Sequence, residues 1–111
     1  MRAGDVVRVD FGMPVGSEPG LIQPAVVVTA DVVLAGGRWR TLHVVSVTSN
    51  TERAFVTDVL ISAPGLDRPS VAEGHLLATI DRAQILEEDL GNIGPVALRQ
   101  IRSVLADLLD I

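Results

Sequence analysis

The chain has 111 residues, a formal net charge of −5 and no cysteine. This length predicts one domain, residues 1–111, and 48% hydrophobic residues are enough for a core of its own. The absence of cysteine excludes disulfides, thiolate metal sites and a cysteine nucleophile, and it suits a reducing compartment. Because the sequence has no apolar run of about 20 residues and no leader-like start, we expect a cytoplasmic protein with no membrane partner.

All nine cationic residues are arginines, and they are scattered along the chain. Residues 1–66 hold five arginines and six acids (net −1), whereas residues 67–111 hold four arginines and eight acids (net −4). Contacts to phosphates need clustered cations, so this balance disfavours nucleic acid, and double-stranded DNA in particular. Any nucleic-acid site is therefore expected in the first 66 residues.

Five short segments rich in β-branched residues predict strands, and turn residues separate them. These segments are residues 5–11, 23–30, 41–50, 56–62 and 71–80. Pro24 has no N–H, so it should lie at the start or the edge of its strand. Gly74 predicts a bend or bulge in the last strand. Short strands at even spacing indicate a mainly β fold (α+β by content), a small curled sheet or barrel.

The other segments divide into connections and one helix. Residues 31–40 contain a Gly-Gly pair and predict a connection, such as a hairpin tip, and residues 81–94 predict a connection with a short apolar element. Residues 95–111 predict a helix that begins at a proline. Its apolar stripe is formed by Leu98, Ile101, Leu105 and Leu108. Such a stripe favours a helix that covers the end of the sheet, with a dimer or partner contact as the alternative.

No common catalytic signature is present: the sequence lacks a phosphate-binding loop, a GxSxG elbow and a dinucleotide fingerprint. The two histidines, His43 and His75, are 32 positions apart, which gives no local support for a metal site. We expect His43 to be structural, because it lies in an apolar strand, and His75 to be a weaker candidate for function. No cofactor or metal is expected.

Two polar loops remain as the candidate site, because each adjoins a strand that should be central to the core. The sequences of these loops are "GMPVGSEPGLIQ" and "TSNTERA". The polar groups that they offer are Ser17, Glu18, Gln23, Thr48, Ser49, Asn50 and Arg53. Taken singly, each of these residues also fits ordinary turn or strand chemistry.

The order of these segments resembles the MazF/PemK family, the toxins of bacterial toxin–antitoxin pairs. The resemblance is carried by "RAGDVVRVDFGMPVGSEPG", "PAVVVTAD", "VVSVTSN", "SVAEGHLLATIDRAQI" and a helix after "GNIG". It implies an SH3-like barrel of five to seven strands, as in CcdB and PemK toxins, with a C-terminal α-helix. It also implies a homodimer that is bound by a cognate antitoxin.

The resemblance further implies metal-independent, sequence-specific cleavage of single-stranded RNA, mainly mRNA. In this family the ribose 2′-OH is the nucleophile, and the products are a 2′,3′-cyclic phosphate and a 5′-hydroxyl. The protein then needs no nucleophile of its own; it orients the 2′-OH and stabilises the charge of the phosphorane. The antitoxin's acidic, partly hydrophobic tail lies over the RNA groove. Because this chain is itself acidic, we expect apolar contacts to contribute more to antitoxin binding here.

Two catalytic positions follow from the resemblance. The family's threonine at the end of the third strand corresponds to Thr48, and its arginine before the strand proline corresponds to Gln23. Glutamine can hydrogen-bond a phosphate but cannot neutralise it. Arg53 is the first candidate to replace the missing cation, followed by Arg38 or Arg40.

RNA contacts are expected from the two loops, at Ser17, Glu18, Pro19, Ser49 and Asn50. The alternative function is a catalytically degenerate binding protein on the same fold. Such a protein would dimerise and bind an antitoxin or another target without cleaving RNA. A third reading, an unrelated structural domain, is disfavoured by the number of matched segments in order.

Overall fold

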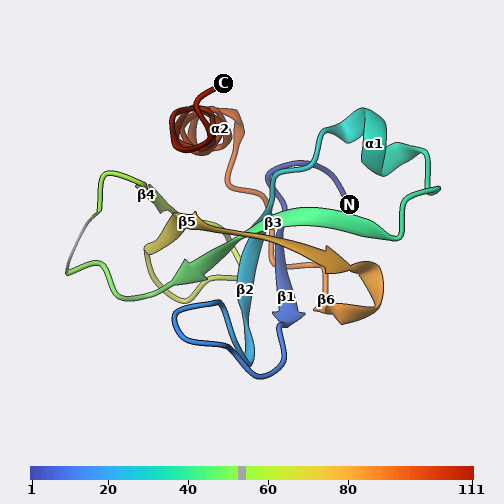
Figure 1. The fold of residues 1–111 in the computed structure, drawn as a ribbon, viewed down its shortest axis with the longest axis horizontal. Helices are drawn as coiled ribbons and strands as arrows, with labels where there is room; N and C mark the ends of the chain where they lie inside the picture. The colour runs from blue at the N-terminus through green and yellow to red at the C-terminus, as the bar shows by residue number, and fades with distance from the viewer. Residues whose placement is uncertain (53–54) are drawn as a thin grey trace.

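Over the described residues, 1–52 and 55–111 of a computed structural model, the chain forms an antiparallel sheet of six strands (Figure 1). The predicted site residue Arg53 lies outside the described residues. The strands are β1 (Val6–Asp10), β2 (Ile22–Val27), β3 (Thr41–Thr48), β4 (Asp58–Ile61), β5 (Ser70–Asp81) and β6 (Ile85–Glu87). They pair in the order β4-β5-β3-β2-β1-β6. The prediction of a mainly β fold is confirmed, and the strand number is within the predicted range.

The sheet curls into an open, SH3-like barrel because β5 is long and bent. Its register with β3 shifts between Val45 and Val47, which leaves extra residues on β5 around Gly74. A Cβ at Gly74 would lie 2.6 Å from the carbonyl oxygen of Thr57, so only glycine fits this bend. Beyond the bend, β5 leads through the short 3₁₀ helix η1 (Arg82–Gln84) into β6, which pairs with β1. The predicted bend at Gly74 is confirmed.

The strands β1, β2 and β3 have buried valines on both faces of the sheet, and these valines divide into two clusters. Alternation along a strand sends successive side chains to opposite faces. On β3, Val45 and Val47 belong to the first cluster, which lies under the C-terminal helix and includes Ile101. Leu42 and Val44 belong to the second cluster, which lies inside the curl of the sheet and includes Leu34. Residues two positions apart on β3 therefore belong to the same cluster. The buried residues lie in the second half of β2 and along β3 up to Val47.

The C-terminal helix α2 (Pro95–Leu109) covers one face of the sheet and contacts β4 and β5 (Figure 1). Ile101 and Leu105 are buried in the first cluster, as the stripe predicts. Leu108 is 45% exposed, so its expected place in the buried stripe is wrong. The helix ends one residue later, beyond the part that the sheet covers. Within the described residues, no helix is both long and apolar enough to span a membrane.

The segment predicted as a plain connection contains a short helix, α1 (Asp31–Ala35). This helix has no side-chain cap, and one turn is too short to show a helical period in the sequence. Tertiary contacts stabilise it: Leu34 is buried in the second cluster, and the Asp31 carboxylate accepts the N–H of Ala3 at 2.7 Å. The segment does connect two consecutive antiparallel strands, β2 and β3, as predicted, and only its short helix was not expected.

The second connection, residues 81–94, contains η1 and β6. Asp81 begins η1 with a capping box, in which its carboxylate accepts the N–H of Ala83 and its own N–H donates to Gln84. The Ala83 N–H lowers the pKa of Asp81 and outweighs the effect of desolvation, and the nearby Arg40 guanidinium lowers this pKa further. Gln84 donates to the carbonyl oxygen of Asp10 at 3.1 Å, which holds η1 against β1.

Candidate functional site

The first polar loop, residues 11–21, is a compact structure that closes on itself. The Glu18 carboxylate accepts the N–H of Val15 at 3.1 Å, and the N–H of Glu18 donates back to the carbonyl oxygen of Val15. A Cβ at Gly20 would lie 2.4 Å from the Pro14 ring, so the return of the loop requires glycine. Leu21 has a φ of 59°, an uncommon conformation for a residue with a Cβ. Local hydrogen bonds and tight packing therefore set the position of this loop.

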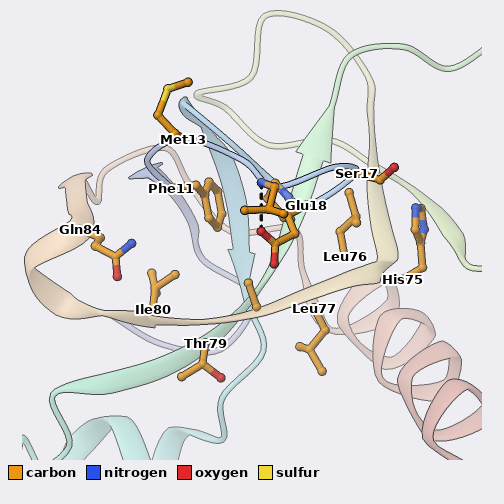
Figure 2. A pocket seen from close by; sticks show the side chains of 13 residues that line it. Phe11, Met13, Ser17, Glu18, His75, Leu76, Leu77, Thr79, Ile80 and Gln84 are labelled. Atoms are coloured by element: carbon orange, nitrogen blue, oxygen red, sulfur yellow. Dashed lines mark hydrogen bonds between the residues drawn. The ribbon is translucent and has the colours of Figure 1, made fainter.

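An apolar groove of about 610 Å³ lies between this loop and β5 (Figure 2). Ser17, Glu18 and Pro19 line it, together with the apolar residues Phe11, Met13, Val15, Leu76, Leu77, Ala78 and Ile80. Glu18 is the one residue with a formal charge among the described residues that line the groove, apart from the titratable His75. The predicted RNA contacts of the first loop thus face a groove that is lined mostly by apolar types of residue and has no arginine among its lining residues.

Two polar cavities adjoin the end of β3, and together we call them the polar cleft. The first has about 410 Å³ and is lined by Arg8, Pro24, Val47, Thr48, Ser49, Gly65, Leu66, Asp67, Arg68 and Ser70. The second has about 620 Å³ and is lined by Ser49, Asn50, Thr51, Glu52, Arg68 and Pro69. Ser49 and Arg68 line both cavities, so the two lie side by side. Thr48 lines the first cavity, Asn50 lines the second, and Ser49 lines both.

A turn at the end of β3 presents these three residues. The Thr48 hydroxyl oxygen accepts the N–H of Asn50 at 3.2 Å, and the Asn50 side chain accepts the N–H of Glu52 at 3.1 Å. Both are side-chain hydrogen bonds that stabilise a tight turn. Because Thr48 accepts in this contact, its own hydroxyl proton stays free to donate to a ligand.

Gln23 is half-buried on β2 and lines neither the polar cleft nor the apolar groove. It lies opposite Val9 of β1. The β2–β3 register ends at the pair Ala25 and Ser46, and its continuation by two residues brings Gln23 opposite Thr48. Pro24 is the third residue of β2 and pairs with Arg8 of β1, so it is not at the start of its strand as predicted, although it precedes the residues of β2 that pair with β3. The two predicted catalytic positions are thus on adjacent strand ends, although only Thr48 lines the cleft.

Two arginines in the polar cleft, Arg8 and Arg68, were not singled out from the sequence. Arg8 enters because β1 pairs with β2, which places it directly opposite Pro24. Arg68 enters because β5 pairs with β3, which places Val71 opposite Thr48. Both neighbours result from strand pairing, so no local sequence signal indicates them. Arg40, one proposed substitute for a catalytic arginine, forms an ion pair with Asp81 at 3.1 Å instead.

Both histidines are exposed, His43 on β3 and His75 on β5. His75 lines the apolar groove, where Nδ1 lies 3.2 Å from the Thr57 hydroxyl and the ring packs edge-on against Phe55 at 5.3 Å. Within residues 1–52 and 55–111, no three His, Cys, Asp or Glu residues are grouped so that they could hold a metal ion.

Solved structures share this fold over nearly the whole chain. MazF from Deinococcus radiodurans is 23% identical with a TM-score of 0.83, covering 100% of this chain and 97% of that chain. A mycobacterial endoribonuclease in complex with its cognate antitoxin is 20% identical with a TM-score of 0.78, covering 100% and 96%. The Mycobacterium tuberculosis toxin MazF-mt6 is 18% identical with a TM-score of 0.75, covering 96% and 97%. At these identities the similarity shows the fold.

The sequence itself matches a family over almost its entire length. The match is to the PemK-like, MazF-like toxins of type II toxin–antitoxin systems, and it spans residues 2–109. The match includes both polar loops, the six strands of the described residues and all of α2. This chain therefore belongs to the PemK-like, MazF-like toxin family of type II toxin–antitoxin systems.

Proposed function

We propose that this protein is a cytoplasmic, homodimeric toxin that cleaves single-stranded RNA, mainly mRNA, without a metal ion. The observation that supports this proposal most is the polar cleft, where Thr48, Ser49 and Asn50 lie with two arginines. Hydroxyl, amide and guanidinium groups are the donors that bind a sugar–phosphate backbone. The 2′-hydroxyl of the substrate gives its proton to water as its oxygen attacks the adjacent phosphorus. The bond from phosphorus to the 5′-oxygen breaks, a 2′,3′-cyclic phosphate forms, and the departing 5′-oxygen takes a proton from water to become a 5′-hydroxyl.

In this reaction the protein acts by positioning and by charge stabilisation. The free proton of the Thr48 hydroxyl donates to a phosphate oxygen as negative charge grows on the phosphorane. Ser49 and Asn50 hold the backbone on either side of the reacting phosphate, while Ser17, Glu18 and Pro19 contact more distant nucleotides. The β3 turn fixes this geometry before RNA binds, so little ordering is needed in the complex.

Cleavage of single-stranded RNA in EDTA tests the proposal. Purified protein should cut a mixed-sequence RNA and leave 5′-hydroxyl ends, which a kinase can label directly without prior phosphatase treatment. Intact RNA across many sequences, from protein with a native circular dichroism spectrum, would contradict the proposal. Cleavage that is lost in EDTA and restored by a divalent ion would contradict the metal-independent reaction.

A second function, binding without turnover, is favoured by one observation: Gln23 is neutral and does not line the cleft. Substitution Gln23→Arg distinguishes the two. We expect it to raise the cleavage rate at least about 10-fold, because a cationic fork opposite Thr48 adds a charge-assisted donor to the phosphorane. The rate is measured under single-turnover conditions. Gln100→Arg on α2 adds the same charge at a residue that does not line the cleft, and it should leave the rate unchanged.

The Gln23 variants also show whether the native chain binds a target without cleaving RNA. If the wild type is inert and Gln23→Arg creates activity, the native chain is a degenerate toxin that binds a target without cleaving RNA. If strong native activity survives in Gln23→Ala, another residue supplies the cation. Equal rates for Gln23→Arg and Gln100→Arg would contradict a role for position 23.

The apolar groove is the proposed docking surface for the antitoxin. Met13 is 83% exposed and Val15 is 75% exposed, and an apolar patch of this kind is typical of a partner interface. We expect the dissociation constant of the antitoxin complex to change less than about threefold between roughly 0.05 and 0.5 M salt, because few charges meet there. Met13→Asp should weaken binding more than about 10-fold.

Val32→Asp is the matched control for this measurement, because Val32 is equally exposed but lies on α1, away from the groove. Isothermal titration calorimetry at several salt concentrations gives both quantities. A steep loss of affinity with salt, or equal effects of the two aspartates, would contradict the assignment of the groove.

A further inference from the structure

The polar cleft contains cations at both sides of Thr48, in a row that crosses the sheet. Ser70 and Val71 of β5 lie beside the end of β3, Pro24 of β2 comes next, and Arg8 of β1 lies opposite Pro24. Three interstrand spacings separate β5 from β1, about 14 Å along the sheet. A strand of RNA that follows this row would pass an arginine on each side of Thr48.

Arg68 is the more available of the two arginines. It is exposed, and within the described part of the chain its guanidinium forms no ion pair. Its backbone is fixed, because the hydroxyl of Ser70 donates to the Arg68 carbonyl oxygen at 3.0 Å and Ser70 is only 3% exposed. An anchored backbone with a free guanidinium is prepared to bind an anion at a low cost in ordering.

Arg8 is partly neutralised by an acid. Its Nε lies 3.4 Å from a carboxylate oxygen of Glu87, and both side chains are partly exposed, so this is a weak pair. Asp67 and Glu52 also line the cleft, which balances the formal charge of its walls. A phosphate will therefore be held by a specific guanidinium contact rather than by a broad positive potential. Arg68 is the residue that can make such a contact.

We propose that Arg68, supported by Arg8, binds a backbone phosphate of single-stranded RNA beside Thr48 and so supplies the cation that Gln23 lacks. A guanidinium offers two parallel N–H donors to two phosphate oxygens, and it stays charged at every physiological pH. The identification of the ligand as RNA rests on the proposed function. The binding of a phosphate at Arg68 rests on the cleft itself, and the apolar groove offers no arginine for that role.

The test is a binding measurement that needs no cleavage. The probe is a fluorescent, random-sequence, single-stranded RNA with a 2′-O-methyl group at every sugar, which removes the nucleophile. Arg68→Gln should lower its affinity about fivefold to tenfold at about 0.1 M salt and reduce the slope of log K against log salt by about 0.7. Arg68→Lys should recover part of the affinity. Arg99→Gln, an exposed arginine on α2, has the same charge change and should leave the binding curve unchanged.

Two results would overturn the assignment. One is a wild type that does not bind the probe, and the other is an Arg68→Gln curve that matches that of Arg99→Gln. Cleavage rates measured beside binding separate this inference from the proposed function. If the wild type cleaves and Arg68→Gln cleaves and binds equally well, the inference fails and the function stands. If nothing cleaves but Arg68→Gln still weakens binding, the function fails and the phosphate site stands.

Discussion

Thr48→Ala should lower the rate of RNA cleavage by about 100-fold or more, because it removes a donor that is already positioned at the reacting phosphate. Thr48 is half-buried at the end of β3 and its hydroxyl oxygen accepts the N–H of Asn50, so the hydroxyl proton is available to donate to a phosphate. A single-turnover assay with the wild type and the variant at equal concentration measures this loss.

Two further variants show whether the loss of rate comes from the missing hydroxyl of Thr48 or from a general effect on β3. Thr48→Ser keeps the hydroxyl and the hydrogen bond to Asn50, and it should retain most of the activity. Thr41→Ala truncates an exposed threonine at the other end of the same strand, and its rate should equal that of the wild type. If Thr48→Ala cleaves RNA at the wild-type rate, the site is elsewhere.

Ile101→Ala should destabilise the protein by about 3 kcal/mol, within the range for isoleucine truncations in a core. Ile101 is fully buried between α2 and the sheet, in the cluster that includes Val45 and Val47 of β3. A domain of this size has a free energy of unfolding of about 5–15 kcal/mol. The change therefore removes a large part of the stability and loosens the strand that ends at Thr48.

Urea unfolding at a fixed protein concentration measures this free energy, because assembly of subunits would add a concentration dependence. Val96→Ala truncates an apolar residue on the same helix that is 65% exposed, and it should change the stability by less than about 0.5 kcal/mol. A similar loss in both variants would show that α2 does not depend on its buried side for stability.

Hydropathy and turn residues were enough to identify most elements of this fold. The strands follow from runs of valine between glycine and proline turns, and α2 follows from a stripe that begins at Pro95. Each of these signals lies within one segment of the sequence and covers enough residues to show its period. The helix α1 has five residues and no side-chain cap, so tertiary contacts stabilise it, namely the burial of Leu34 in the second cluster and the hydrogen bond between Asp31 and Ala3. The stripe on α2 also overestimates burial, because the sheet ends before Leu108.

In the candidate site, too, some features follow from the local sequence and others follow only from the pairing of strands. The sequence by itself determined that Thr48, Ser49 and Asn50 lie near the end of a central strand, and that position 23 has no positive charge. Only the tertiary structure decided which groups surround Thr48. Arg8 and Arg68 are 60 positions apart in the sequence, and the pairing of β1 with β2 and of β3 with β5 brings them to one cleft. The register of strand pairing depends on the burial of whole strand faces. A short sequence motif therefore does not indicate which residues of different strands become neighbours.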